Sequence, residues 1–231
     1  MTQAAHWLVV EGEADKKLIA RICKKLHIQS VEVKPTTPEE LEVSGRGNGK
    51  AGVYQSLEDF IPDLFDVDKP LKKLAVMVDA DQTIHGEGFA KTLAEITARL
   101  AKFDYTLDVA QSTQANGLVF SMVSEPNLPA IGVWIMPNNQ DDGAIESWIK
   151  SCSDPQRCHL LAHAEQTVSN LPNRSFTGNN LPKAEVATWL AWQKKPSIGL
   201  YAAVPLLDEQ AQSYQQLVSW LKYLFSSEVE T

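Results

Sequence analysis

Hydrophobic runs alternate with amphipathic segments through the first part of the chain. Short apolar runs bounded by polar or turn-forming residues are typical of buried strands, and apolar residues three and four apart are typical of helices. The predicted strands are 6–10, 31–35, 73–78, 117–123 and 131–137. The predicted helices are 13–28, 53–65 and 88–103. We expect Pro62 to interrupt the second helix, and the last two strands are close enough in sequence to pair as neighbours.

Beyond about residue 140 the pattern becomes helical. The predicted helices are 143–152, 155–170, 181–194 and 208–225, with an irregular connector at 171–182. Strand-helix alternation followed by helices predicts an α/β fold, with a mostly parallel sheet flanked by helices and a helical C-terminal portion. We assign residues 1–150 to the α/β core and 151–231 to the helical portion packed on it, with a single domain as the alternative.

Acidic residues follow two of the predicted strands. Glu11 and Asp15 come after "LVV", and Asp79 and Asp81 end the segment "LAVMVDAD". Ligands of parallel sheets bind beyond the carboxyl ends of the strands, where these acids are expected to meet. Residues two apart in an extended chain point the same way, so Asp79 and Asp81 are expected to address one ion. Magnesium prefers such oxygen ligands, whereas zinc favours His and Cys.

These acids also have an ordinary interpretation. An acid after a strand often caps the next helix or lies in its first turn, where the helix dipole favours negative charge. Glu13 and Asp15 fit that role. The combination of Glu11 with Asp79 and Asp81 is more specific than one helix cap, so we favour a site for a divalent cation.

Composition and charge limit the kind of partner. The chain has 231 residues, 44% of them hydrophobic, and carries 29 acidic against 21 basic residues for a net charge of -8. That balance excludes a broad basic surface for nucleic acid, so phosphate contacts should be local and metal-mediated. We see no signal peptide and no apolar run long enough to span a bilayer, and therefore expect a cytoplasmic protein that does not enter membranes.

The two acidic motifs resemble those of a known superfamily. "VVEGEAD" followed by "VMVDAD" is similar to the two motifs of the Toprim fold, which is shared by topoisomerases, bacterial primases, recombination proteins and small nucleases. The resemblance implies that Glu11, Asp79 and Asp81 bind Mg²⁺ or Mn²⁺ and act in catalysis. In the branch of the OLD nucleases, an acid at the position of Asp15 helps to bind a second metal ion.

The resemblance continues toward the C-terminus. The segment "WIMPNNQDDGAIESWI" (134–149) resembles the "PNN…G…E" segment of small, uncharacterised Toprim-like proteins. It adds Glu146 as a metal ligand and Asn138 and Asn139 as substrate contacts. The segment "LPKAEVATWLAW" (181–192) is similar to the region that supplies a lysine in the nuclease branch, which implies a catalytic role for Lys183.

Two further motifs have weaker chemistry. "SGRGNGK" is not a phosphate-binding loop of the Walker type, because Ser44 replaces the first glycine and Ala51 follows Lys50. Arg46 and Lys50 are nevertheless candidates for contacting a substrate phosphate. Cys152, Cys158, His159 and His163 are arranged as C-x5-C-H-x3-H, but that cysteine spacing is unusual for zinc and we favour a packing role.

The sequence therefore predicts a metal-dependent phosphoryl-transfer protein, most simply a nuclease that hydrolyses DNA or RNA with Mg²⁺. The segments that make a complete topoisomerase or replicative primase are not expected in 231 residues. The alternative is a non-enzymatic Toprim module that binds a metal with a nucleotide or nucleic acid and acts through a protein partner.

Overall fold

The structure, a computed structural model, describes residues 5–36, 49–69, 71–154, 156, 159–176 and 178–226. Its centre is a six-stranded sheet in the order β2-β1-β3-β6-β5-β4. The strands are β1 (Ala5–Val10), β2 (Val31–Pro35), β3 (Leu71–Asp79), β4 (Tyr105–Leu107), β5 (Leu118–Met122) and β6 (Ile131–Met136). The pairs β2-β1, β1-β3 and β3-β6 are parallel, whereas β5 is antiparallel to both of its neighbours.

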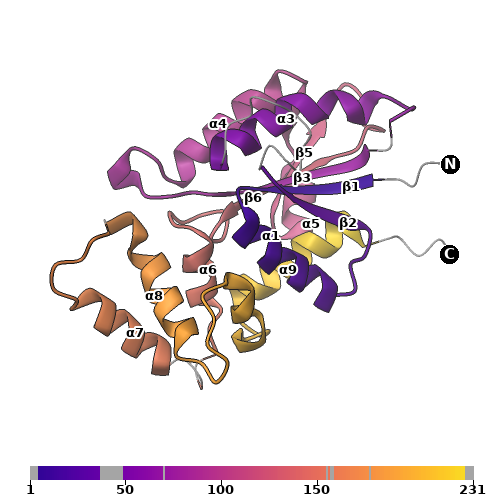
Figure 1. Cartoon of the computed structure of the whole chain (residues 1–231). Helices are drawn as coiled ribbons and strands as arrows, with labels where there is room; N and C mark the ends of the chain where they lie inside the picture. Colours follow the sequence, from indigo (N-terminus) through magenta and orange to yellow (C-terminus); the bar gives the residue numbers. More distant parts are fainter. Residues whose placement is uncertain are drawn as a thin grey trace.

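Helices cover both faces of this sheet (Figure 1). The α-helices are α1 (Glu13–Lys25), α3 (Gly49–Phe65), α4 (Phe89–Ala101), α5 (Val109–Ala115), α6 (Ile145–Ser151), α7 (His159–Ser169), α8 (Leu181–Ala191) and α9 (Gln212–Phe225). The described residues also form three short 3₁₀ helices, η1 (Thr83–His85), η2 (Gly178–Asn180) and η3 (Leu200–Leu206). Helices α3 and α4 form the upper layer, and α1, α5, α6 and α9 lie below the sheet.

Successive side chains of the central strands point to opposite faces of the sheet, which gives the protein one apolar core on each face. In β1, Leu8 and Val10 face the core that includes α1 and α9, whereas Val9 faces the core that includes α3. The same alternation in β3 sends Ala75 and Met77 to one side, opposite to Val76 and Val78. Both faces are apolar because each is covered by helices, as expected for parallel strands.

The structure confirms an α/β fold with a mostly parallel sheet and corrects several element boundaries. Strands β5 and β6 pair directly, as predicted. Helix α3 begins at Gly49 and continues through Pro62, which does not interrupt it. Strand β4, helix α5 and helix η3 were not predicted, because their segments lack a long periodic pattern of apolar residues.

The C-terminal helices complete the lower core. In α9, Trp220 and Leu224 pack against Gly132 of β6, where no side chain separates the helix from the strand. Lys150 of α6 pairs with Glu165 of α7 at 2.6 Å and with Glu185 of α8 at 2.7 Å. A shared apolar core thereby joins the helical portion to the sheet, and one charged cluster joins α6 to α7 and α8.

In the part of the chain that the structure describes, no helix is both long enough and apolar enough to cross a lipid bilayer.

Candidate active site

The carboxyl ends of β1 and β3 bring two of the predicted acids together. The strands are hydrogen-bonded neighbours, with Val9 opposite Val76. Glu11 follows β1, and its Oε1 accepts a hydrogen bond of 2.8 Å from the backbone N–H of Asp79, at the end of β3. Two acids 68 positions apart in sequence therefore lie in contact.

Asp15 joins them from the first turn of α1. The chain turns from β1 into α1 at Gly12, whose N–H donates to Asp15 Oδ2 at 3.0 Å. The carboxylate thus closes the N-terminal turn of the helix, as the ordinary interpretation predicted. It also faces the same cavity as Glu11 and Asp79.

Glu146 enters from the opposite side, on α6. Asp79 Oδ1 accepts a hydrogen bond of 3.0 Å from the N–H of Ile145, the first residue of that helix. Glu146 is the next residue and is 4% exposed. Its Oε2 is buried and has no hydrogen-bond partner within the described part of the chain. An unpaired buried carboxylate oxygen is costly, so this atom is a candidate ligand for a cation.

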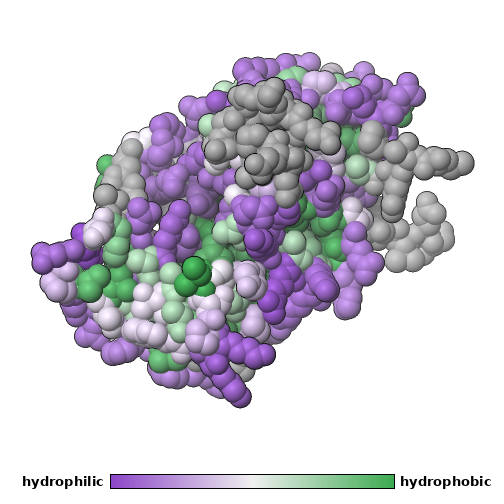
Figure 2. Space-filling model, in the orientation of Figure 1, coloured by the Kyte–Doolittle hydropathy of each residue, from purple (hydrophilic) through white to green (hydrophobic). Residues whose placement is uncertain are grey.

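These acids surround a cavity of about 410 Å³ between α1, α6 and α8. Its lining includes Glu11, Asp15, Asp79 and Glu146, together with Lys183 of α8. Figure 2 shows this face of the molecule hollowed between α8 and α1. A smaller void of about 10 Å³ lies among Glu11, Asp15 and Asp79, a size on the order of one water molecule.

The carboxylates affect each other electrostatically. Burial, followed by repulsion from Glu11, Asp15, Glu146 and Asp81, raises the pKa of Asp79 well above its ordinary value. Burial also raises the pKa of Glu11 to about 7 and that of Asp15 to about 6, although backbone N–H donors oppose both shifts. Burial raises the pKa of Glu146 as well, against the attraction of Lys183.

Asp81 does not line the acidic cavity, contrary to the expectation for an extended D-x-D segment. The strand ends at Asp79, and Asp81 has a φ of 63°, so the alternation of a strand no longer applies. A two-way backbone bridge at 2.8 Å holds Asp81 to Gly143. Its side chain is 49% exposed and borders a neighbouring cavity of about 170 Å³, which Glu146 also lines.

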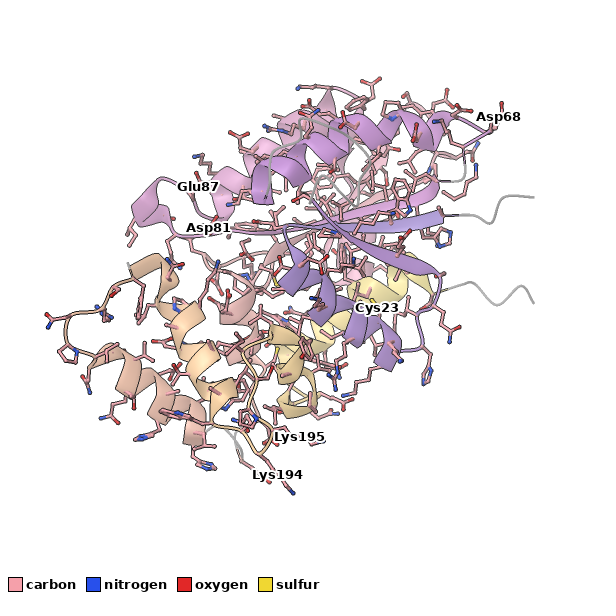
Figure 3. The ribbon with its side chains drawn as sticks, viewed as in Figure 1. Cys23, Asp68, Asp81, Glu87, Lys194 and Lys195 are labelled. Carbon is pink, nitrogen blue, oxygen red and sulfur yellow. The ribbon has the colours of Figure 1, made fainter. Side chains whose placement is uncertain are left out.

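Lys50 neutralises Asp81. Lys50 Nζ lies 2.5 Å from Asp81 Oδ2 and 3.5 Å from Glu87 Oε2, and it donates to the carbonyl of Ala80 at 3.3 Å. Figure 3 shows Asp81 and Glu87 near one another at this edge of the sheet. The predicted phosphate contact is thus adjacent to the predicted metal ligands, but it is engaged with one of them.

The carboxylates of the cavity supply oxygen ligands of the kind that a divalent cation such as Mg²⁺ prefers. Among the described residues, no group of three or more His, Cys, Asp or Glu side chains is arranged to hold a metal ion as the side chains stand. Glu11, Asp15 and Asp79 each turn one oxygen toward a backbone N–H. The chemistry nevertheless fits, because the cavity offers buried carboxylate oxygens, one of them unpartnered, and a cation would relieve their mutual repulsion.

The chain matches the model of one protein family. The match extends over residues 5–226 and thus includes every acid of the site. The chain belongs to the family described as "Protein of unknown function (DUF3226)". No curated protein and no solved structure matches it.

In this DUF3226 protein, the predicted asparagines form a turn. Asn138 Oδ1 accepts from the N–H of Asp141 at 2.9 Å, and its Nδ2 donates to the Asp141 carboxylate at 2.7 Å. Asn139 has a φ of 61°, and its Oδ1 accepts from Ile135 N–H at 2.7 Å. Both side chains therefore shape the loop after β6. Arg46 lies outside the described residues.

Sequence reasoning missed Asp142. Its Oδ1 accepts from the N–H of Phe89 at 2.8 Å, which caps α4, and its Oδ2 accepts from the N–H and hydroxyl of Thr83. These hydrogen bonds lower the pKa of Asp142. The residue fixes the loop after Asp81 to the loop that precedes α6. The sequence "QDD" (140–142) shows an acid at this position, but it does not indicate that the side chain accepts hydrogen bonds from the backbone of residues 83 and 89.

The C-x5-C-H-x3-H segment packs as expected where it is described. Cys152 is fully buried in the lower core, and burial raises the pKa of its thiol to about 12. His163 packs against the Trp192 ring with centroids 5.4 Å apart. Cys158 lies outside the described residues.

Proposed function

We propose that this protein is a metal-dependent nuclease that hydrolyses phosphodiester bonds of DNA or RNA with Mg²⁺ or Mn²⁺. The observation that carries the proposal is the gathering of Glu11, Asp15, Asp79 and Glu146 around one cavity, with the Glu146 Oε2 atom left unpartnered. Four carboxylates in one cavity, one of them buried and three half-buried, are destabilising unless protonated or neutralised by a cation. We also propose that the protein acts in the cytoplasm.

A Toprim-like relationship is part of the proposal. It is supported by the position of the acids, because the first follows β1 and the D-x-D segment follows β3, its parallel neighbour. The order of strands and helices along the first half of the chain agrees with alternating α/β units. Both features are those expected from the motif resemblance.

Glu11, Asp79 and Glu146 would hold the first ion, and Asp15 would contribute to a second. Asp81 joins them once Lys50 releases it. When bound, such ions supply positive charge that polarises a phosphodiester and an attacking water. No zinc chemistry is indicated, since these are oxygen ligands.

The chain's own residues would perform the remaining steps. Lys183 is exposed at the cavity rim, attracts Asp15 and Glu146 electrostatically, and is placed to bind a phosphate oxygen. Lys50 would move from Asp81 to the phosphate as the site fills, and so stabilise charge that develops during cleavage. Glu11 has a pKa of about 7 before a cation binds, so near neutral pH it would release its proton as it becomes a metal ligand.

Two larger cavities lack the carboxylates that a metal-dependent active site needs. One, of about 640 Å³, lies near the start of β3 and is lined by Lys72, Lys73 and Tyr223 among others. The other, of about 660 Å³, lies along α1 and η3. Neither brings carboxylates together, so size alone does not identify the reactive centre.

The test uses purified protein with labelled single-stranded and duplex DNA and RNA, in Mn²⁺, in Mg²⁺ and in EDTA. Glu11→Gln and Asp79→Asn variants, purified identically and checked for folding by circular dichroism, exclude contaminating nucleases. We expect cleavage only with metal and a loss of at least about 100-fold in each variant. Cleavage that persists unchanged in both variants, or no cleavage of any substrate, would overturn the proposal.

One observation favours a second candidate, a binding module without catalysis. Asp81 is already paired with Lys50, which leaves a predicted ligand neutralised. A protein that binds metal and nucleic acid but cleaves neither DNA nor RNA in the same assay would identify that module. Its partner protein would then be sought by crosslinking at the cavity rim.

A further inference from the structure

A seam between α1 and η3 leads away from the acidic cavity. The cavity is lined by Gly12, Ala14 and Asp15 at the start of α1 and by Leu200 of η3. Farther along the same two elements, a second cavity of about 660 Å³ is lined by Arg21, Lys24, Lys25 and Pro205, among others. The two hollows therefore lie in succession along one helix and its neighbouring segment.

The seam is basic although the chain is acidic. Lys24 and Lys25 follow Arg21 by three and four residues, so both lie beside it on one exposed face of α1. Lys25 is neutralised by Glu209 at 2.6 Å. Within the described residues, Arg21 and Lys24 pair with no carboxylate, in contrast to Lys17, which lies 3.7 Å from Glu13. Figure 2 shows the hydrophilic surface over α1. Unpaired positive charge of this kind suits an anionic ligand.

η3 also carries an exposed aromatic ring, directly after Leu200 of the acidic cavity and close to Arg21 of the second cavity. Tyr201 of η3 is 40% exposed, and the Arg21 guanidinium lies 5.9 Å from the centre of its ring. Basic side chains beside an accessible ring form the combination that binds single-stranded nucleic acid, since the cations contact phosphates and a base stacks on the ring. In a duplex, the bases are not available for such stacking.

The spacing fits a polymer whose scissile bond lies at the acids. At a rise of 1.5 Å per residue, Arg21 and Lys24 lie about 9 and 14 Å along the helix from Asp15. Phosphates of one stacked strand repeat about every 3.4 Å, so this separation corresponds to about three to four nucleotides.

We infer that the α1–η3 seam binds a single strand of DNA or RNA on one side of the bond to be cleaved. Arg21 and Lys24 contact its phosphates and Tyr201 stacks on a base. The inference rests on the proposed nuclease function, for which it defines the substrate as single-stranded and the direction in which the strand leaves the site.

Binding without metal tests the seam separately from cleavage. Fluorescence anisotropy with 15-nucleotide single-stranded DNA, single-stranded RNA and the DNA duplex, all in EDTA, compares wild type with Arg21→Ala/Lys24→Ala. The matched control is Lys194→Ala/Lys195→Ala, which removes the same charge from two exposed lysines beyond α8 (Figure 3). We expect the seam variant to bind single strands about tenfold more weakly in 0.1 M salt, with a salt slope smaller by about 1.4, and the control to bind like wild type.

Tyr201 gives a second, charge-neutral measurement. Tyr201→Ala should weaken binding of single strands about tenfold, and Tyr201→Phe, which keeps the ring, should bind like wild type. Whichever of DNA and RNA binds more tightly identifies the preferred strand, and a loss of affinity on that strand supports the seam.

Three results would overturn the inference. The first is equal weakening in the seam variant and its lysine control. The second is tighter binding of duplex than of single strands, and the third is equally good competition by polyglutamate, which would indicate an acidic polypeptide partner. Metal-dependent cleavage together with the first result would refute strand binding by the seam but support the nuclease function. Binding that depends on the seam, without any cleavage, would support strand binding and refute the nuclease function.

Discussion

Lys50 Nζ lies 2.5 Å from Asp81 Oδ2 and thereby joins the first turn of α3 to the chain that leaves β3. The lysine is 15% exposed and also lowers the pKa of the neighbouring Glu11 by its charge. A cation that recruits Asp81 must therefore displace this ammonium group. Under the proposed function, this pair would make metal binding and phosphate binding interdependent at one edge of the sheet.

Replacement of Lys50 by Met should separate metal affinity from catalysis. Removal of a positive charge beside Glu11 and Asp81 should strengthen Mn²⁺ binding by about threefold to tenfold, which appears as a larger metal-induced rise in melting temperature. Cleavage should nevertheless fall by about 100-fold, because the phosphate loses a stabilising charge. Thermal scans at several Mn²⁺ concentrations and a cleavage assay measure the two effects.

Lys91→Met is the matched control for that experiment. Lys91, in the first turn of α4, pairs at 2.8 Å with Glu87 in the loop before that helix. Unlike Lys50, it has no ion pair with Asp81 among the described residues. It should change neither the metal response nor cleavage. Parallel loss of both properties in Lys50→Met would instead indicate that Lys50 only supports the fold.

The buried acids predict an unusual pH dependence of stability without metal. The pKa of Glu11 is about 7 and that of Asp15 about 6 in the folded protein, both above their ordinary values. The folded state therefore holds protons that the unfolded state releases, and stability should fall as pH rises from about 4.5 to 7. In EDTA, the melting temperature should drop by on the order of 5 °C over this range.

Glu11→Gln and saturating Mn²⁺ should each reduce that pH dependence. The variant removes a carboxyl group whose pKa is raised to about 7, and the cation replaces the proton as the neutralising charge. A melting temperature that rises with pH in EDTA, or an unchanged slope in Glu11→Gln, would contradict this account of the site.

The packing of α9 on the sheet can be tested at Gly132. A Cβ at this position would collide with Leu224 and press against Trp220 and Ala75. Gly132→Ala should lower the stability by about 1 to 3 kcal/mol through overpacking. Gly178→Ala, where a Cβ meets nothing within 4 Å, should be close to neutral. Urea denaturation measures the free energy of unfolding of both variants. Equal values for the two variants would show that α9 does not pack against Gly132.

Asp142 should control the order of the loop between Asp81 and α4. Asp142→Ala removes the acceptor of the Phe89 and Thr83 N–H groups, so hydrogen exchange in residues 82–89 should accelerate and the melting temperature should fall. Asp142→Asn retains one acceptor oxygen and should have a smaller effect. Unchanged exchange in Asp142→Ala would show that the loop is held by other contacts.

The sequence predicted the elements that have long, regular patterns. The apolar run before Asp79 corresponds to β3, and the amphipathic segment 88–103 contains α4. Strand β4 has three residues and α5 has seven, which is too short for periodicity to distinguish them from loops. Pro62 failed as a breaker because the surrounding helix is fixed by Leu57, Ile61 and Leu64 in the upper core.

The site was predictable where it depends on strand order and unpredictable where it depends on side-chain direction. Parallel pairing of β1 and β3 suffices to bring Glu11 to Asp79. The left-handed backbone of Asp81 and its pairing with Lys50 depend on the loops that follow the strand, and no local pattern encodes them. Asp142 was missed for the same reason, since its partners are more than 50 positions away.

The wall of the acidic cavity comes from both halves of the chain. Glu11, Asp15, Asp79 and Glu146 belong to the first 150 residues, whereas Lys183, Ala187 and Leu200 come from beyond them. Lys150 pairs with Glu165 and Glu185 and so ties α7 and α8 to the helix that carries Glu146. The C-terminal helices therefore supply one wall of the acidic cavity and also support the helix of an inner acid, so a substitution that unseats α8 should alter both.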